Sequence, residues 1–174
     1  LPKYTLYHVF KGDKKLDEIL IEVDDNFYII AGASGFYQLA NLNSKQRNKI
    51  LNQLESLNNN DYLIIDVGAG ISNNVLNMIV SSQQTIIVTT PEPTAITDAY
   101  GIIKSIVSVN KNDIKLNLVV NRVRSIIEAK QVSNRIMSIV KQFLDVDINY
   151  LGFIFDDPVV YKSVKEQEPF IRNY

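Results

Sequence analysis

The stretch Tyr62-Leu63-Ile64-Ile65-Asp66-Val67-Gly68-Ala69-Gly70 is an apolar run that ends in a carboxylate and two glycines. A continuous apolar run is typical of a parallel strand covered on both faces, whereas a half-exposed strand alternates apolar and polar residues. The run Ile86-Ile87-Val88 repeats the pattern further along the chain. The stretch therefore predicts a buried strand over 62–66 in a mainly parallel sheet.

Apolar runs and amphipathic stretches alternate along the rest of the chain. Besides 62–66, we expect strands at 27–31, 85–89, 116–121 and 150–155. The spacing of apolar residues predicts helices at 44–57, 72–81, 94–109 and 128–144, the first of them capped by Ser44. Residues 4–22 are expected to form two short helices broken at Gly12. This order predicts an α/β fold with a mainly parallel sheet flanked by helices, as a single domain over 1–174.

The composition is that of an ordinary globular chain. The 174 residues include 18 basic and 19 acidic side chains, a formal net charge of −1, and 46% apolar residues. This balance gives no electrostatic reason to expect a specific nucleic-acid partner or a polybasic membrane surface. Cysteine is absent, which excludes disulfides, a thiol nucleophile and cysteine-ligated metal. No run approaches the roughly 18–20 apolar residues of a membrane span, and we expect a cytoplasmic protein.

Polar or glycine-rich segments follow every expected strand from the second onward. These segments are 66–70, 89–94, 121–124 and 156–158. In open α/β sheets, ligands bind beyond the carboxyl ends of the strands, and parallel strands end at one edge. The candidate site is therefore this edge.

Asp66 is the first candidate residue, because it ends its expected strand. A carboxylate in this place holds Mg²⁺ in P-loop NTPases, directly or through water, since a hard cation needs oxygen ligands. Gly68 and Gly70 would let backbone N–H groups approach a terminal phosphate. A turn-capping Asp in a glycine-rich loop remains the alternative. A dinucleotide fingerprint fails at Asn73, where a third glycine is needed, and a receiver domain fails at Asn121, where a lysine is needed.

Several segments together resemble the MinD/ParA-type P-loop ATPases, which have a deviant Walker A loop. Residues 61–71 resemble their Walker B strand and switch II, and 90–100, 119–123 and 152–160 resemble later family segments in the same order. Residues 5–12 resemble the helix after switch I. The form Gly68-Ala69-Gly70-Ile71 is most similar to the FlhG (FleN) branch, the MinD-like regulators of flagellar number and placement. The resemblance covers nearly the whole chain.

The resemblance implies a role for each matching residue. Asp66 would be the Walker B acid near Mg²⁺, and Gly68 and Gly70 would be the switch II residues beside the γ-phosphate of ATP. Asn121 would hydrogen-bond the adenine edge, which suits an amide because it carries both a donor and an acceptor.

The rest of the adenine pocket follows from the same resemblance. Arg122 would flank or stack on the base, and Asp157 and Pro158 would line the opposite wall. The alternative for Asn121 and Arg122 is a polar strand end with a surface salt bridge.

The sequence departs from the family's pattern at its start. The Walker A loop is a glycine-rich run with two lysines, and Lys11-Gly12-Asp13-Lys14 does not match it. The switch I aspartate also has no counterpart here. We therefore expect the chain to be the larger C-terminal part of a MinD-like ATPase domain, incomplete at the N-terminus and inactive by itself.

The resemblance implies an ATP-dependent homodimer that hydrolyses ATP with Mg²⁺ and acts as a switch. The implied partners are a flagellar signal-recognition-type GTPase or flagellar switch-complex proteins. Membrane attachment, peripheral and at the inner face of the cell membrane, would need a C-terminal segment that this sequence does not include. Two alternatives remain: a non-catalytic interaction module of the same fold, and a ParA-type DNA-partitioning ATPase, against which a pI of about 5.9 argues.

Overall fold

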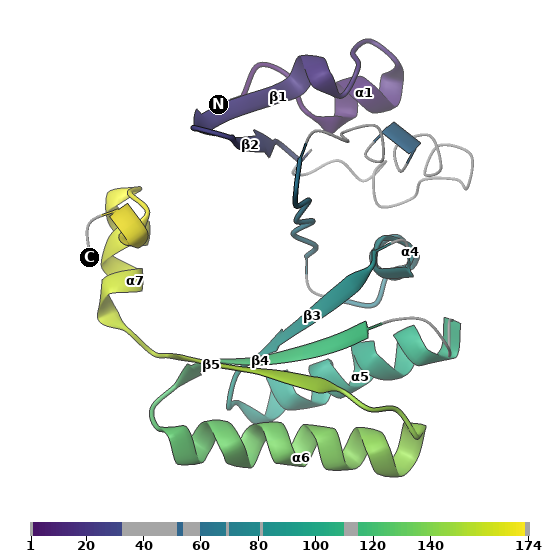
Figure 1. Cartoon of the computed structure of the whole chain (residues 1–174), viewed down its shortest axis with the longest axis vertical. Coiled ribbons are helices and arrows are strands. Elements are labelled where there is room, and N and C mark those ends of the chain that lie inside the picture. Colours follow the sequence, from purple (N-terminus) through teal and green to yellow (C-terminus); the bar gives the residue numbers. More distant parts are fainter. Residues whose placement is uncertain are drawn as a thin grey trace. The chain divides into compact units, whose positions relative to one another are not determined.

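The computed structural model describes residues 2–32, 52–53, 60–68, 70–80, 82–109 and 115–172. The chain divides into two compact units, Leu1–Gly68 with Ser72–Asn74, and Ala69–Ile71 with Val75–Tyr174. Figure 1 traces the helices and strands of both units. The expectation of a single domain stays a prediction.

The first unit holds a short helix and a β-hairpin. Helix α1 (Leu6–Lys11) is followed by the 3₁₀ turn η1 (Asp17–Ile19) and by the antiparallel strands β1 (Leu20–Asp24) and β2 (Phe27–Ile30). Helix α1 ends as expected at Gly12, whose φ of 85° is left-handed. Its start is stabilised by His8, whose Nδ1 accepts the Thr5 backbone N–H at 3.2 Å. His8 is thus a structural residue of α1.

The sequence predicts a second short helix after Gly12, within 4–22. This prediction is wrong at the C-terminal end of that range. Residues 20–24 form β1, and 27–30 pair with them antiparallel instead of joining a parallel sheet. A tight turn closes this hairpin, and its Asn26 has a φ of 59°. Asn tolerates the left-handed region, so the turn favours local pairing over a long-range parallel partner.

The second unit contains a parallel sheet of three strands, ordered β3-β4-β5. The strands are β3 (Gln84–Thr89), β4 (Lys115–Val123) and β5 (Asn149–Phe155). The helices are α4 (Asn73–Val80), whose first residues belong to the other unit, α5 (Pro93–Val109), α6 (Ile126–Leu144) and α7 (Pro158–Glu166), followed by the 3₁₀ turn η2 (Phe170–Arg172). The structure confirms the predicted α/β fold with a parallel sheet flanked by helices.

The core of this unit lies on one face of the sheet. Helices α5 and α6 both cover that face (Figure 1), and their Ile103, Ile106 and Ile136 pack with Leu118 and Val120 of β4. On the opposite face, Ile86 and Val88 of β3 and Leu151 and Ile154 of β5 are exposed. Within this unit taken by itself, the described helices α5 and α6 cover one face of these strands, and cover on both faces stays a prediction.

The strand predicted over 62–66 is also wrong. Residues 62–68 have no regular secondary structure, and Tyr62 and Ile64 are 88% and 89% exposed. An apolar run supplies strand propensity, but a strand also needs a hydrogen-bonding partner, and none of the described strands pairs with this segment. The helix predicted over 44–57, with its Ser44 cap, lies outside the described residues except for Asn52 and Gln53, which are helical.

Asn117 of β4 links all three strands of the sheet. Its Nδ2 donates to the Thr85 carbonyl of β3 at 3.3 Å, and its Oδ1 accepts from Asn149 Nδ2 of β5 at 3.0 Å. We expect Asn117→Ala to lower the free energy of unfolding by about 1–3 kcal/mol, because the Asn149 amide and the Thr85 carbonyl lose a buried partner.

Urea unfolding measures this effect. Asn121→Ala is the matched control on the same strand, since the Asn121 amide bonds to the next residue of the chain and should cost less than about 1 kcal/mol. Equal costs for the two variants would show that Asn117 does not link the strands.

Candidate functional site

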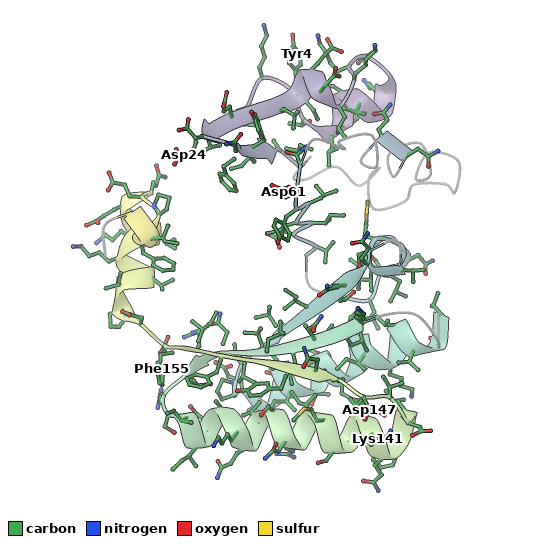
Figure 2. The ribbon with its side chains drawn as sticks, in the orientation of Figure 1. Tyr4, Asp24, Asp61, Lys141, Asp147 and Phe155 are labelled. Atoms are coloured by element: carbon green, nitrogen blue, oxygen red, sulfur yellow. The ribbon has the colours of Figure 1, made fainter. Side chains whose placement is uncertain are left out.

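The candidate site begins at the carboxyl edge of the parallel sheet. Strands β3, β4 and β5 run parallel, so their carboxyl ends, at Thr89, Val123 and Phe155, lie on one edge. In Figure 2, Phe155 marks this edge, and Lys141 and Asp147 mark the opposite one. Parallel α/β sheets bind ligands at the carboxyl edge.

A β-bulge shapes the end of β4. Val120 pairs with Phe153 and Val123 with Phe155, so β4 has one residue more than β5 between these pairs. The bulge contains Asn121 and Arg122, and Arg122 has a left-handed φ of 58°. Bulges bend a strand and re-aim its side chains, and they are frequent next to functional sites. Two of the candidate residues therefore lie on a distorted strand end.

Three hydrogen bonds hold this bulge. The Arg122 backbone N–H donates to Asn121 Oδ1 at 2.9 Å, and Arg122 Nε donates to Asp156 Oδ1 at 3.3 Å. The Asp156 backbone N–H donates to the Val123 carbonyl at 2.9 Å. The strand end and the segment after β5 are therefore joined, and the surface salt bridge of the alternative interpretation is present.

Asp157 and Pro158 begin helix α7. Asp157 is the N-cap, and its Oδ1 accepts the Val159 backbone N–H at 2.8 Å, while Pro158 occupies the first turn. The structure therefore places the Arg122 side chain against Asp156, directly before this helix start, while the adenine pocket implied by the resemblance stays a prediction. The role that the structure shows for the Asp157 carboxylate is to cap the helix.

Sequence reasoning did not select Asp156 as a site residue. Its carboxylate nevertheless contacts Arg122, and its backbone N–H contacts β4. The sequence pattern that could have identified Asp156 is a second acidic residue directly before Asp157, at a strand end already assigned to the candidate site.

The segment between β3 and α5 is a further part of this edge. The Thr90 hydroxyl donates to the Glu92 carboxylate, and Thr97 Oγ1 donates to the Pro93 carbonyl at 2.9 Å. These bonds lie at the start of α5 and in the short segment that joins it to the carboxyl end of β3.

Asp66, Gly68 and Gly70 are exposed in the structure. A Cβ added to Gly68 or Gly70 would meet no atom within 4 Å, and Gly70 has a φ of 117°, which favours glycine. Asp66 and Gly68 belong to the first unit, whereas Gly70 and the candidate residues of β4 and α7 belong to the second.

Within the described ranges, no group of three or more His, Asp or Glu side chains is arranged to hold a metal ion. Mg²⁺ is usually bound through only one or two carboxylates, together with waters and substrate phosphates. A role for the Asp66 carboxylate in holding Mg²⁺ stays a prediction.

A search for membrane-spanning helices gives a negative result. Among the residues that the structure describes, no helix combines the length and the apolar character that crossing a membrane requires.

No protein-family model matches this chain, but curated relatives match it over nearly its whole length, among them the following three. Antiactivator FleN of Pseudomonas aeruginosa is 29% identical over 95% of the chain and 59% of its own length. The flagellum site-determining protein YlxH of Helicobacter pylori is 32% identical over 94% and 55%, respectively. The septum site-determining protein MinD of Bacillus subtilis is 32% identical over 95% and 60%. The chain thus spans only 55% to 60% of the length of these relatives.

Solved structures share the fold of the chain. Pyrococcus furiosus cell division ATPase MinD has a TM-score of 0.70 at 20% identity, covering 98% of this chain and 68% of that one. The ParA family ATPase of Chlorobium tepidum has a TM-score of 0.71 at 16% identity, covering 99% and 69%. A chain of the MinC:MinD cell division protein complex of Aquifex aeolicus has a TM-score of 0.69 at 20% identity, covering 98% and 66%. At such identities the likeness shows the fold alone.

Proposed function

Because the chain is homologous to FleN, YlxH and MinD and has the fold of MinD/ParA-type P-loop ATPases, we propose that the protein containing it binds and hydrolyses Mg-ATP as a dimerisation switch. The observation that supports this best is the carboxyl end of β4. There an amide and a guanidinium are held on a bulge beside the start of α7.

The adenine base would bind at this strand end. The Asn121 amide offers a donor and an acceptor to the base edge, and the planar Arg122 guanidinium offers a surface for stacking. Asp157 and Pro158, fixed by their places at the start of α7, would form the opposite wall.

The phosphates would bind near Asp66, Gly68 and Gly70. Bound Mg²⁺ would neutralise charge on the phosphates during attack by water. Asp66 would hold the metal's hydration shell with its carboxylate, and the two glycines would donate backbone N–H groups to the terminal phosphate. The sequence contains no Walker A pattern, so the groups that cradle the phosphates are not among the residues named here.

The names of the relatives suggest what such a switch would control. FleN is an antiactivator and YlxH determines the flagellum site, whereas MinD determines the septum site. We propose control of flagellar number or placement, through an ATP-dependent homodimer and contacts with a flagellar signal-recognition-type GTPase or switch-complex proteins. The protein would act in the cytoplasm and peripherally at the inner face of the cell membrane. Analytical ultracentrifugation of the full-length protein with and without ATP tests the dimer directly.

Asn121→Ala tests the base contact. In the full-length protein we expect it to weaken ATP binding by about 1–3 kcal/mol, and GTP binding by a different amount, because adenine and guanine present different donors and acceptors to an amide. Isothermal titration calorimetry gives both dissociation constants.

Asn149→Ala is the control for this experiment, since it removes an amide at the opposite end of the sheet, where β5 begins. That change should leave both dissociation constants as they are. If Asn121→Ala lowers the affinity for ATP and for GTP equally, or lowers neither, Asn121 does not contact the base.

A further inference from the structure

We propose that Asp156 is a positioning residue of the nucleotide site: by holding Arg122, it keeps the end of β4 in the conformation that presents Asn121 to the base. This inference rests on the proposed function. It concerns which base the site prefers, and it assigns a role to a residue that neither the sequence pattern nor the comparisons single out.

The backbone of Arg122 is unusual for its place in the fold. Among the described residues, the non-glycine residues with positive φ are Asn26, Arg122, Asp145 and Gln167. Asp145 and Gln167 are helix C-caps, and Asn26 lies in a hairpin turn, so all three occupy places where the left-handed region is common. Arg122 instead lies within a strand, where a side chain with a Cβ disfavours this conformation. Other contacts must therefore hold it.

Asp156 supplies two of these contacts from a different element. Its carboxylate Oδ1 accepts Arg122 Nε at 3.3 Å, and its backbone N–H donates to the Val123 carbonyl at 2.9 Å. The next residue, Asp157, caps α7 and so fixes the segment that carries Asp156. The guanidinium is thus tied to the segment that joins the neighbouring strand β5 to the capped start of α7.

The held backbone determines how the Asn121 amide is oriented. The Arg122 N–H donates to Asn121 Oδ1 at 2.9 Å, which fixes the oxygen end of the amide against the chain. The amide plane then presents its donors and its remaining acceptor capacity in one direction. Adenine and guanine carry different donor and acceptor patterns, so a fixed amide discriminates between them and a rotating amide does not.

The Asp156 carboxylate also compensates the charge of Arg122. The two side chains are 60% and 47% exposed, so an unpaired guanidinium here would attract any phosphate, whichever base it carried. Removal of the carboxylate should therefore reduce the preference between bases more than it reduces nucleotide affinity as a whole.

Asp156→Asn in the full-length protein tests the proposal, because it removes the charge and keeps the shape. We expect the ratio of the GTP and ATP dissociation constants to fall by about three- to tenfold, while the melting temperature without nucleotide is unchanged. Asp156→Glu should restore most of the preference. In the apo protein, the NMR signal of the Arg122 ε-N–H should shift in Asp156→Asn.

Asp147→Asn is the matched control. Asp147 pairs with Lys141 at 3.1 Å, also on the surface, but at the opposite edge of the sheet. This pairing raises the pKa of Lys141, chiefly through the hydrogen bond to Asp147. Its loss should change neither the nucleotide preference nor the Arg122 signal.

The outcomes separate the inference from the function on which it rests. If Asn121→Ala alters the preference and Asp156→Asn does not, the inference is overturned and the proposed function stands. The inference is also overturned if Asp156→Asn weakens the binding of ATP and of GTP equally and lowers the apo melting temperature. That result is expected of an ion pair with a purely structural role. A full-length protein that binds neither nucleotide overturns both.

Discussion

Asp66→Ala should reduce Mg-ATP hydrolysis by the full-length protein at least about a hundredfold, while the melting temperature without nucleotide stays nearly unchanged. The structure explains why the two effects separate. Asp66 is exposed, lies in a segment without regular secondary structure, and is not part of either buried core cluster. Its loss should therefore affect the bound metal and phosphates, and not the packing.

The thermal shift on adding Mg-ATP gives the decisive measurement. A ligand stabilises a protein in proportion to its binding, so Asp66→Ala should show a reduced Mg²⁺-dependent shift. Asp61→Ala is the matched control, because Asp61 is an exposed aspartate at the start of the same segment, labelled in Figure 2. That variant should hydrolyse ATP normally.

The opposite pattern would assign Asp66 a structural role. A carboxylate that only caps a turn contributes about 0.5–2 kcal/mol of stability, so its loss would lower the apo melting temperature and preserve the Mg-ATP shift. The switch II assignment would then depend on Gly68 and Gly70 alone.

The elements of the parallel sheet could be predicted from sequence because each carries its own pattern. Helix α6 was expected at 128–144 and spans Ile126–Leu144, and β5 was expected at 150–155 and spans Asn149–Phe155. The earlier start of α6 reflects its N-cap, Ser125, whose hydroxyl accepts the Glu128 backbone N–H. A local cap of this kind could have been read from the sequence.

What sequence could not supply was pairing between distant segments. The apolar run at 62–66 has the composition of a strand, but the described strands leave it without a partner. The bulge at Asn121 and Arg122 likewise depends on the register between β4 and β5. Neither segment by itself therefore predicts the left-handed backbone of Arg122 or its contact with Asp156. The backbone geometry of these residues could therefore not be predicted from their types alone.

The same limit applies to the faces of the sheet. The run Ile86-Ile87-Val88 predicts cover on both faces, since every residue in it is apolar. In the structure the side chains alternate: Ile87 faces α5 and α6 and is 6% exposed, whereas Ile86 is 57% exposed. Composition sets how apolar a strand is, but the helices that pack on it decide which face is buried.

These two neighbouring isoleucines allow a direct test of which faces are covered. Ile87→Ala should lower the free energy of unfolding of the 174-residue chain by about 2–5 kcal/mol, because it opens a cavity in a close-packed core. Ile86→Ala removes the same atoms from an exposed surface and should cost about 1 kcal/mol or less. Urea unfolding measures both variants. Similar losses would show that Ile86 is also buried in solution, so that the sheet has a second covered face, as the unbroken apolar run predicts.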